Sequence, residues 1–231
     1  MKKCAVLHEP GDIVTLAGTR FVVLDVERRG SLPDSLFLLA LESVGASEFG
    51  SSNNYAESDL KKAVDKWLED MGKRGLDNAK LIPREIDLTT LDGSGCYGKL
   101  SVKAAPLTLD EAREYADIIP NAERWCWLAT GWSGPSKSDG DLALYVRSSG
   151  DWGCNHCSGS DGIRPALLLN SDLLVSTDDE VEEDCCGECG CCGGKGLPSL
   201  DGISTVTLLE EIQRRAMRAG SVFMGEDGTD E

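Results

Sequence analysis

The segment from Ser148 to Leu169 (SSGDWGCNHCSGSDGIRPALLL) contains the side chains most suited to chemistry. Cys154 and Cys157 enclose His156 in a Cys-x-x-Cys spacing, which could belong to a metal site or to a redox pair. A structural zinc ion needs four ligands, usually supplied as two separated pairs, and this segment has one pair. A haem attachment site would need a histidine directly after the second cysteine. We therefore interpret these residues as parts of a displayed loop and expect no metal there.

A second cysteine cluster lies near the C-terminus, in a glycine-rich run that follows an acidic run. Thiolates bind soft metals, but ligands this close together do not resemble a folded zinc site, so a linker is the favoured interpretation. Metal binding stays open as the alternative for Cys185, Cys186, Cys189, Cys191 and Cys192.

Arg147 and Arg164 each interrupt an apolar run. They could bind a carboxylate or a phosphate, but a buried arginine that donates to backbone carbonyls or to an acid is the favoured interpretation for both. Trp125 and Trp127 could form a platform on which a sugar stacks. Alternate residues of a strand share one face, so we expect both tryptophans to pack in the core instead.

No catalytic constellation can be recognised. The chain has two histidines, His8 and His156, and neither has a recognisable serine or cysteine partner with an orienting acid. We predict that the protein is not an enzyme.

The elements that must position these residues are mostly strands. Residues 11–26 predict two strands around a tight turn at Ala17–Thr19, and continuous apolar runs predict further strands at 35–41, 125–131, 142–147 and 163–169.

Two helices are predicted between the groups of strands. Apolar residues from Leu60 to Met71 recur with helical period after the N-cap candidate Ser58. Thr108 and Glu111 have the spacing of a capping box, in a helix that ends by Pro120. Strands in groups separated by helices indicate an α+β fold.

Composition excludes some partners and divides the chain. The net charge of −17 argues against nucleic acid, because a phosphate backbone selects a basic surface. No apolar run approaches the length of a membrane helix, so we expect no membrane insertion. The first residues lack the apolar stretch of a signal peptide. We predict a domain at 1–176, an acidic and Cys/Gly-rich linker at 177–203, and a short amphipathic helix with an acidic tail at 204–231.

The order of these motifs resembles a known group of domains. GDIVTLAGTRFVVLDV, a helix with a tryptophan (DLKKAVDKWLEDM), LTLDEAREY, WCWLATG, ALYVRSSGDWG and GIRPALLL follow one another over about residues 10–175. This succession is similar to uncharacterised bacterial and phage domains that end in G-[VI]-R-P-A-L. The resemblance implies a C-type-lectin-like fold, in the branch of the formylglycine-generating enzyme.

The segment 151–162 also resembles the variable segment of proteins diversified by retroelements. In that family AAC codons become NNC codons, which cannot encode Met, Trp, Lys, Glu or Gln. Every residue of the segment except Trp152 is compatible with such a codon. The calcium-ligand patterns Glu-Pro-Asn and Trp-Asn-Asp of sugar-binding lectins are absent, so we expect no cofactor, although oxygen ligands are present at Asp139, Asp141, Asp151, Asn155 and Asp161.

The sequence thus predicts a ligand-binding display protein with a diversified recognition loop at 151–161, to which the loop at 133–140 could contribute. The ligand would be a protein or a glycan, and the C-terminal helix would dock a partner or self-associate. The protein would be cytoplasmic as made, or associated with a virion. The alternatives are an enzyme related to the formylglycine-generating enzyme and a structural domain that binds nothing. The expected ligand-binding residues are Asp151, Trp152, Gly153, Cys154, Asn155, His156, Cys157, Ser158, Ser160, Asp161, Trp132 and Tyr145.

Overall fold

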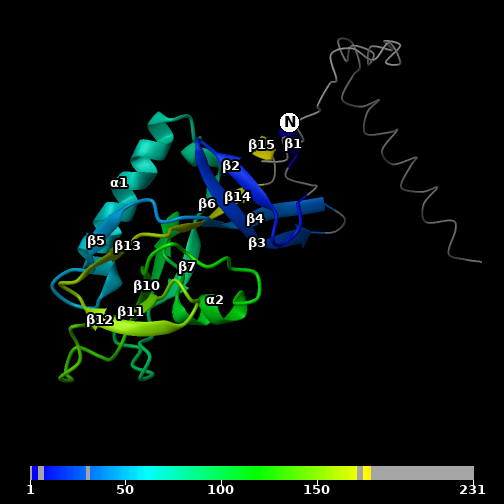
Figure 1. Ribbon diagram of the computed structural model, residues 1–231. Coiled ribbons are helices and arrows are strands. Elements are labelled where there is room, and N and C mark those ends of the chain that lie inside the picture. The colour runs from blue at the N-terminus through cyan, green and yellow to red at the C-terminus, as the bar shows by residue number, and fades with distance from the viewer. Residues whose placement is uncertain (1, 5–7, 30–31, 171–173, 178–231) are drawn as a thin grey trace, which may run out of the picture. The chain divides into compact units, whose positions relative to one another are not determined.

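The computed structural model describes residues 2–4, 8–29, 32–170 and 174–177 (Figure 1). These residues belong to the first of two units of the chain, Met1–Val181. The five clustered cysteines and the C-terminal helix of the sequence prediction lie outside the described residues.

The described residues form an α+β fold, as predicted, with three antiparallel or mixed sheets. The largest sheet has the strand order β1-β15-β2-β3-β4-β14-β6, and β9 also pairs with β14. Its strands are β1 (Lys2–Cys4), β2 (Ile13–Leu16), β3 (Thr19–Arg29), β4 (Leu32–Ala40), β6 (Leu81–Ile82), β9 (Ala104–Ala105), β14 (Ala166–Asn170) and β15 (Leu174–Thr177).

The second sheet has the order β12-β11-β10-β13-β5, which makes β12 an edge strand. A separate hairpin is formed by β7 and β8. The strands of these two sheets are β5 (Ala46–Glu48), β7 (Arg84–Asp87), β8 (Lys99–Val102), β10 (Cys126–Gly131), β11 (Leu142–Val146), β12 (Trp152–His156) and β13 (Ser160–Gly162).

The first predicted hairpin and both predicted helices are confirmed. The turn between β2 and β3 places Ala17 and Gly18 at φ 48° and 76°, the left-handed conformation that favours glycine at such turns. Helix α1 (Asp59–Lys73) begins after Ser58, whose side chain accepts a hydrogen bond from the Lys61 amide. Helix α2 (Leu109–Glu114) begins at the predicted capping box and ends earlier than Pro120. Two short 3-10 helices, η2 (Tyr55–Glu57) and η3 (Asn78–Lys80), flank α1.

Strands β10 and β11 separate two apolar clusters, which we call the α1 cluster and the α2 cluster. Trp127 and Tyr145 belong to the α1 cluster, together with Leu60 of α1, whereas Leu128 and Leu144 belong to the α2 cluster. Successive residues of a strand point to opposite faces. Because both faces are covered, every residue of β10 is buried. This explains why the sequence of β10 is a continuous apolar run rather than an alternating one.

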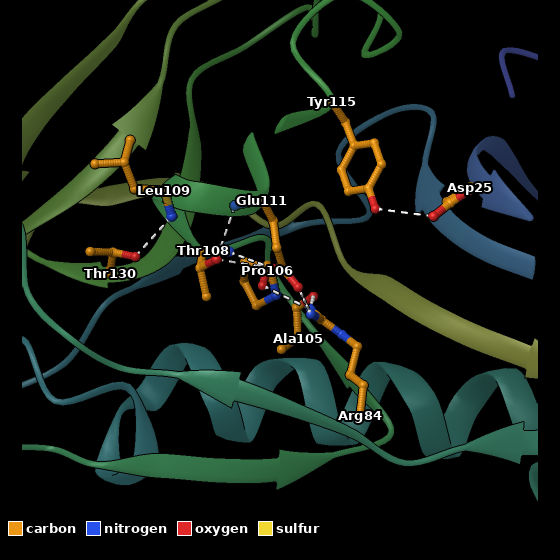
Figure 2. A network of polar contacts seen from close by, with 9 residues as sticks. All are labelled: Asp25, Arg84, Ala105, Pro106, Thr108, Leu109, Glu111, Tyr115 and Thr130. Carbon is orange, nitrogen blue, oxygen red and sulfur yellow. Dashed lines mark hydrogen bonds and ion pairs between the residues drawn. The ribbon is translucent and has the colours of Figure 1, made fainter. Parts of the chain in front are cut away.

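A polar network fixes α2 against the sheets (Figure 2). The guanidinium of Arg84 forms an ion pair with Glu111 and donates to the carbonyl oxygens of Ala105 and Pro106 at 3.2 and 3.3 Å. Glu111 also accepts from the amide of Thr108, which closes the capping box. The amide of Leu109 donates to the Thr130 hydroxyl of β10 at 2.9 Å. The contacts of Thr108, Leu109 and Glu111 involve the N-cap or the first turn of α2, and they fix the position of the helix.

Candidate functional site

The predicted recognition loop is mostly strand, so the expectation of a loop at 151–161 is wrong. Five residues of β12 pair with β11, from Trp152 opposite Val146 to His156 opposite Leu142. β13 then pairs with β5 and β10, after a turn in which the Gly159 amide donates to the His156 carbonyl at 2.7 Å. The segment has no apolar periodicity. Its backbone is instead held in place by main-chain hydrogen bonds to the neighbouring strands.

The two faces of β12 have different surroundings. Trp152, Cys154 and His156 lie on the face of the α2 cluster, and Cys154 packs against that cluster. Gly153 lies on the other face, opposite Tyr145. A Cβ at Gly153 would lie 2.9 Å from Tyr145 Oη, so the backbone approaches the tyrosine too closely for a larger residue.

Three of the expected ligand-binding residues are buried. Cys157 is 2% exposed and belongs to the α1 cluster, and Tyr145 belongs to the same cluster. Asp161 is buried and accepts a hydrogen bond from Asn155 Nδ2 at 3.0 Å. The prediction that these three side chains are displayed is wrong, since all three are buried and contact the interior of the domain.

Cys154 and Cys157 do not form a pair. Cys154 packs on the α2 cluster and Cys157 lies within the α1 cluster, and both are free thiols. Burial, reinforced by the nearby Asp141 carboxylate, raises the pKa of Cys157 to about 12. The described residues contain no group of three or more His, Cys, Asp or Glu side chains that could hold a metal ion.

Five of the expected residues are exposed, and we call them the display patch. Trp152 is 43% exposed, and the guanidinium carbon of Arg113 lies 5.4 Å from the centre of its ring. His156 Nδ1 lies 3.2 Å from Asp141 Oδ2 at the surface. The patch consists of Asp151, Trp152, His156, Ser158 and Ser160.

The two arginines differ in their environments. Arg164 is buried, as predicted, and donates to the carbonyl oxygens of Ala40 at 2.7 Å and Pro120 at 3.0 Å. Arg147 is exposed, so its prediction is wrong. It follows the last residue of β11, where the sheet no longer covers it, and its guanidinium lies 5.8 Å from the ring of Trp125 and 5.9 Å from that of Tyr145.

The three tryptophans before β11 differ in how far they are buried. Trp127 is buried, as predicted, and donates from Nε1 to the Ser47 carbonyl at 2.9 Å. Trp125 contacts the same tyrosine as Trp127, which agrees with a shared face, but it is 44% exposed and stacks on Tyr145 with ring centres 4.9 Å apart. The expected burial of Trp125 is wrong, since this residue precedes the first residue of β10 and its side chain is left exposed. Trp132 is half-buried against the α2 cluster.

One structural residue was missed by sequence reasoning. Asn53 is buried, donates from Nδ2 to the carbonyl oxygens of Ser133 and Leu142 at 2.9 and 3.0 Å, and accepts from the Tyr97 hydroxyl at 2.6 Å. It therefore closes the base of the loop at 133–141. Its sequence neighbours are polar and predicted a loop, so no sequence signal distinguished it.

Comparisons with protein-family models, with curated proteins and with solved structures find no match for this chain. Within the described residues, no helix has both the length and the apolar character that a membrane crossing requires.

Proposed function

We propose that this domain is a binding module of the C-type-lectin-like class that recognises a protein or glycan through its display patch. The observation that carries the proposal is the alternation within residues 151–161. Exposed polar side chains and one exposed tryptophan are interleaved with residues that fix the backbone, namely Gly153, Cys157 and Asp161. A surface held in one conformation before binding loses less entropy when a ligand arrives.

The composition of the patch suits recognition. Trp152 offers a large amphipathic area, and tryptophan is among the residues that dominate binding energies at interfaces. The small hydroxyl and carboxylate groups of Asp151, Ser158 and Ser160 offer hydrogen bonds with little loss of rotamer freedom. The separation of Cys154 and Cys157 on opposite faces gives no support to the alternative, an enzyme that uses a cysteine pair.

A binding experiment tests recognition. The purified protein is applied to arrays of glycans and of cell-surface ectodomains, beside a variant carrying Trp152→Ala and His156→Ala. The matched control carries Glu85→Ala and Lys99→Ala, which remove two exposed side chains of the β7–β8 hairpin. We expect a specific signal that the patch variant loses and the control keeps. No signal from any of the proteins would favour a structural domain that binds nothing. Equal signals from all three would place binding outside the display patch and would contradict the proposal.

Diversification of the patch has a separate test in the gene. A near-copy of the segment encoding Leu142–Leu169 beside a reverse transcriptase, with differences at adenines of the template, would support it. We expect these differences to alter the codons of Asp151, His156, Ser158 and Ser160. They should spare Trp152, which an NNC codon cannot encode, and Gly153, where a side chain would meet Tyr145. The diversification proposal fails if no such repeat exists and the codons of Cys154, His156 and Ser158 do not end in C.

A further inference from the structure

A cavity of about 310 Å³ lies between α2, the residues that follow it, and the α2-cluster face of the second sheet. Its volume is at the lower end of the range of about 300–1,000 Å³ for small-molecule sites. Buried leucines from several elements line its interior. Alanines of α2 and of the residues that follow it also line the cavity, and their small side chains leave space in it. These residues are Leu39, Leu107, Leu109, Leu128, Ala112, Ala116 and Ala122.

Three arginines line the cavity, and of these Arg164 is buried whereas Arg113 and Arg147 are exposed. Arg164 lines the cavity, is 6% exposed, and uses Nε and Nη1 to donate to the carbonyl oxygens of Ala40 and Pro120. Its Nη2 is buried and has no hydrogen-bond partner among the described residues. A guanidinium carries five N–H donors and stays charged. A buried charge without a partner costs free energy that an anion with two oxygens would recover.

No group of the described part of the chain supplies that anion. Arg164 forms no ion pair there, in contrast to Arg84, whose charge is balanced by Glu111. The acidic group of the described part of the chain that influences the pKa of Arg164 is the Cys126 thiol, which also lines the cavity. Burial raises the pKa of that thiol despite the opposing effect of Arg164, so it remains protonated at neutral pH.

The exposed lining residues show where the cavity opens. Arg164 and the leucines are buried. The exposed lining residues are Arg113, Ala116, Asn121, Arg147, Gly150 and Trp152. A ligand would therefore enter between α2 and the start of β12, with its charged end reaching the interior. The ring of Trp152 and the guanidinium of Arg113 lie beside one another at this entrance.

We propose that this cavity binds a small monocarboxylate with an alkyl or aryl body, with the carboxylate held by the guanidinium of Arg164. The apolar body fills the space between the leucines and the alanines. This site is distinct from the display patch except at Trp152, and the inference does not depend on the proposed function.

The test uses calorimetric titration of the full chain with decanoate and 4-phenylbutyrate, each compared with its neutral alcohol, decanol or 4-phenylbutanol. We expect at least one carboxylate to bind on the order of tenfold or more tightly than its alcohol, because a charge-assisted hydrogen bond is lost with the alcohol. Absence of binding by both carboxylates, or equal affinities of each acid and its alcohol, overturns the proposal.

Two kinds of variant locate the site. Ala116→Phe places a large ring at the entrance, and Ala79→Phe is its control, since both alanines are exposed and Ala79 does not line the cavity. We expect Ala116→Phe to weaken binding on the order of tenfold with an unchanged melting temperature, and Ala79→Phe to bind like the wild type. Arg164→Met should abolish the preference for the acid, while Arg164→Lys should keep part of it. If Ala116→Phe is folded and binds as tightly as the wild type, the carboxylate lies elsewhere and the proposal is wrong.

Discussion

The substitution Gly153→Ala tests whether β12 is held as closely as the structure indicates. The added methyl group would lie 2.9 Å from Tyr145 Oη and 3.0 Å from its Cζ. A flexible side chain could move away, but this tyrosine is buried, stacks on Trp125 and packs edge-on against Trp127. The contact must therefore be relieved by movement of the strand or of the aromatic cluster.

Two effects of opposite sign determine the result. Overpacking of a close-packed site costs about 1–3 kcal/mol. Alanine also restricts the unfolded chain, which stabilises the protein by about 0.4–1 kcal/mol where the backbone conformation suits it. The backbone at Gly153 is not in the left-handed region, so the second effect applies there. We expect a net loss of about 1–2 kcal/mol, which corresponds to a fall in melting temperature of roughly 2–8 °C for a chain of this size.

The assay is thermal unfolding followed by circular dichroism, with Gly95→Ala as the control because no atom lies within 4 Å of a Cβ built there. Tyr145→Phe removes the nearest oxygen, which has one weak contact, with Arg147 at 3.5 Å. In that background Gly153→Ala should cost less, by at least about 0.5 kcal/mol, since residues in contact couple. Equal melting temperatures for the wild type and Gly153→Ala, or the absence of coupling, would refute the close packing of β12.

Three further predictions concern buried polar groups and one buried thiol. Glu111→Ala leaves the Arg84 charge unpaired and opens the capping box, so denaturant unfolding should show a loss of about 3–5 kcal/mol, whereas Glu114→Ala on the exposed side should be neutral. Asn53→Ala removes the hydrogen bonds at the base of the loop at 133–141 and should cost about 1–3 kcal/mol, with faster proteolysis inside that loop; an unchanged digestion pattern would contradict this role. The folded state raises the pKa of Cys157 from 9.0 to about 12, so its contribution to stability is complete below pH 9 and is lost as the pH rises toward 12. Cys157→Ala should therefore flatten the fall in melting temperature between these values, and an identical slope would show that this thiol is not the source.

Elements with a strong local pattern could be predicted from the sequence. Helix α1 is specified by apolar residues on one face and by the hydroxyl of Ser58, and α2 by the spacing of Thr108 and Glu111. The turn at Ala17–Gly18 is specified by the backbone freedom of glycine. In each case the residues that determine the structure are neighbours in the chain, so their signal survives without knowledge of the fold.

The display patch could be predicted only in part, because its structure depends on distant residues. Residues 152–156 form a strand because they pair with β11. Position 153 requires glycine because Tyr145 of β11 leaves no space for a side chain there. In the sequence the same glycine is indistinguishable from one that permits a turn. Arg147 and Trp125 were assigned to the interior from their apolar neighbours, but both lie just outside a strand, and a difference of one residue decides whether a side chain is covered.

A strand at the edge of a sheet differs from a loop as a surface for recognition. Its register with β11 places alternate side chains on opposite faces, so only part of the segment can contact a ligand, and exchange of the remaining residues disturbs the core. Fewer positions can therefore vary without loss of stability. If the segment is diversified as proposed, a new side chain at His156 would change the chemistry of the patch without changing the geometry that the register with β11 sets. Tolerance to substitution should consequently follow exposure along residues 151–161, being high at His156 and Ser158 and low at Gly153 and Cys157.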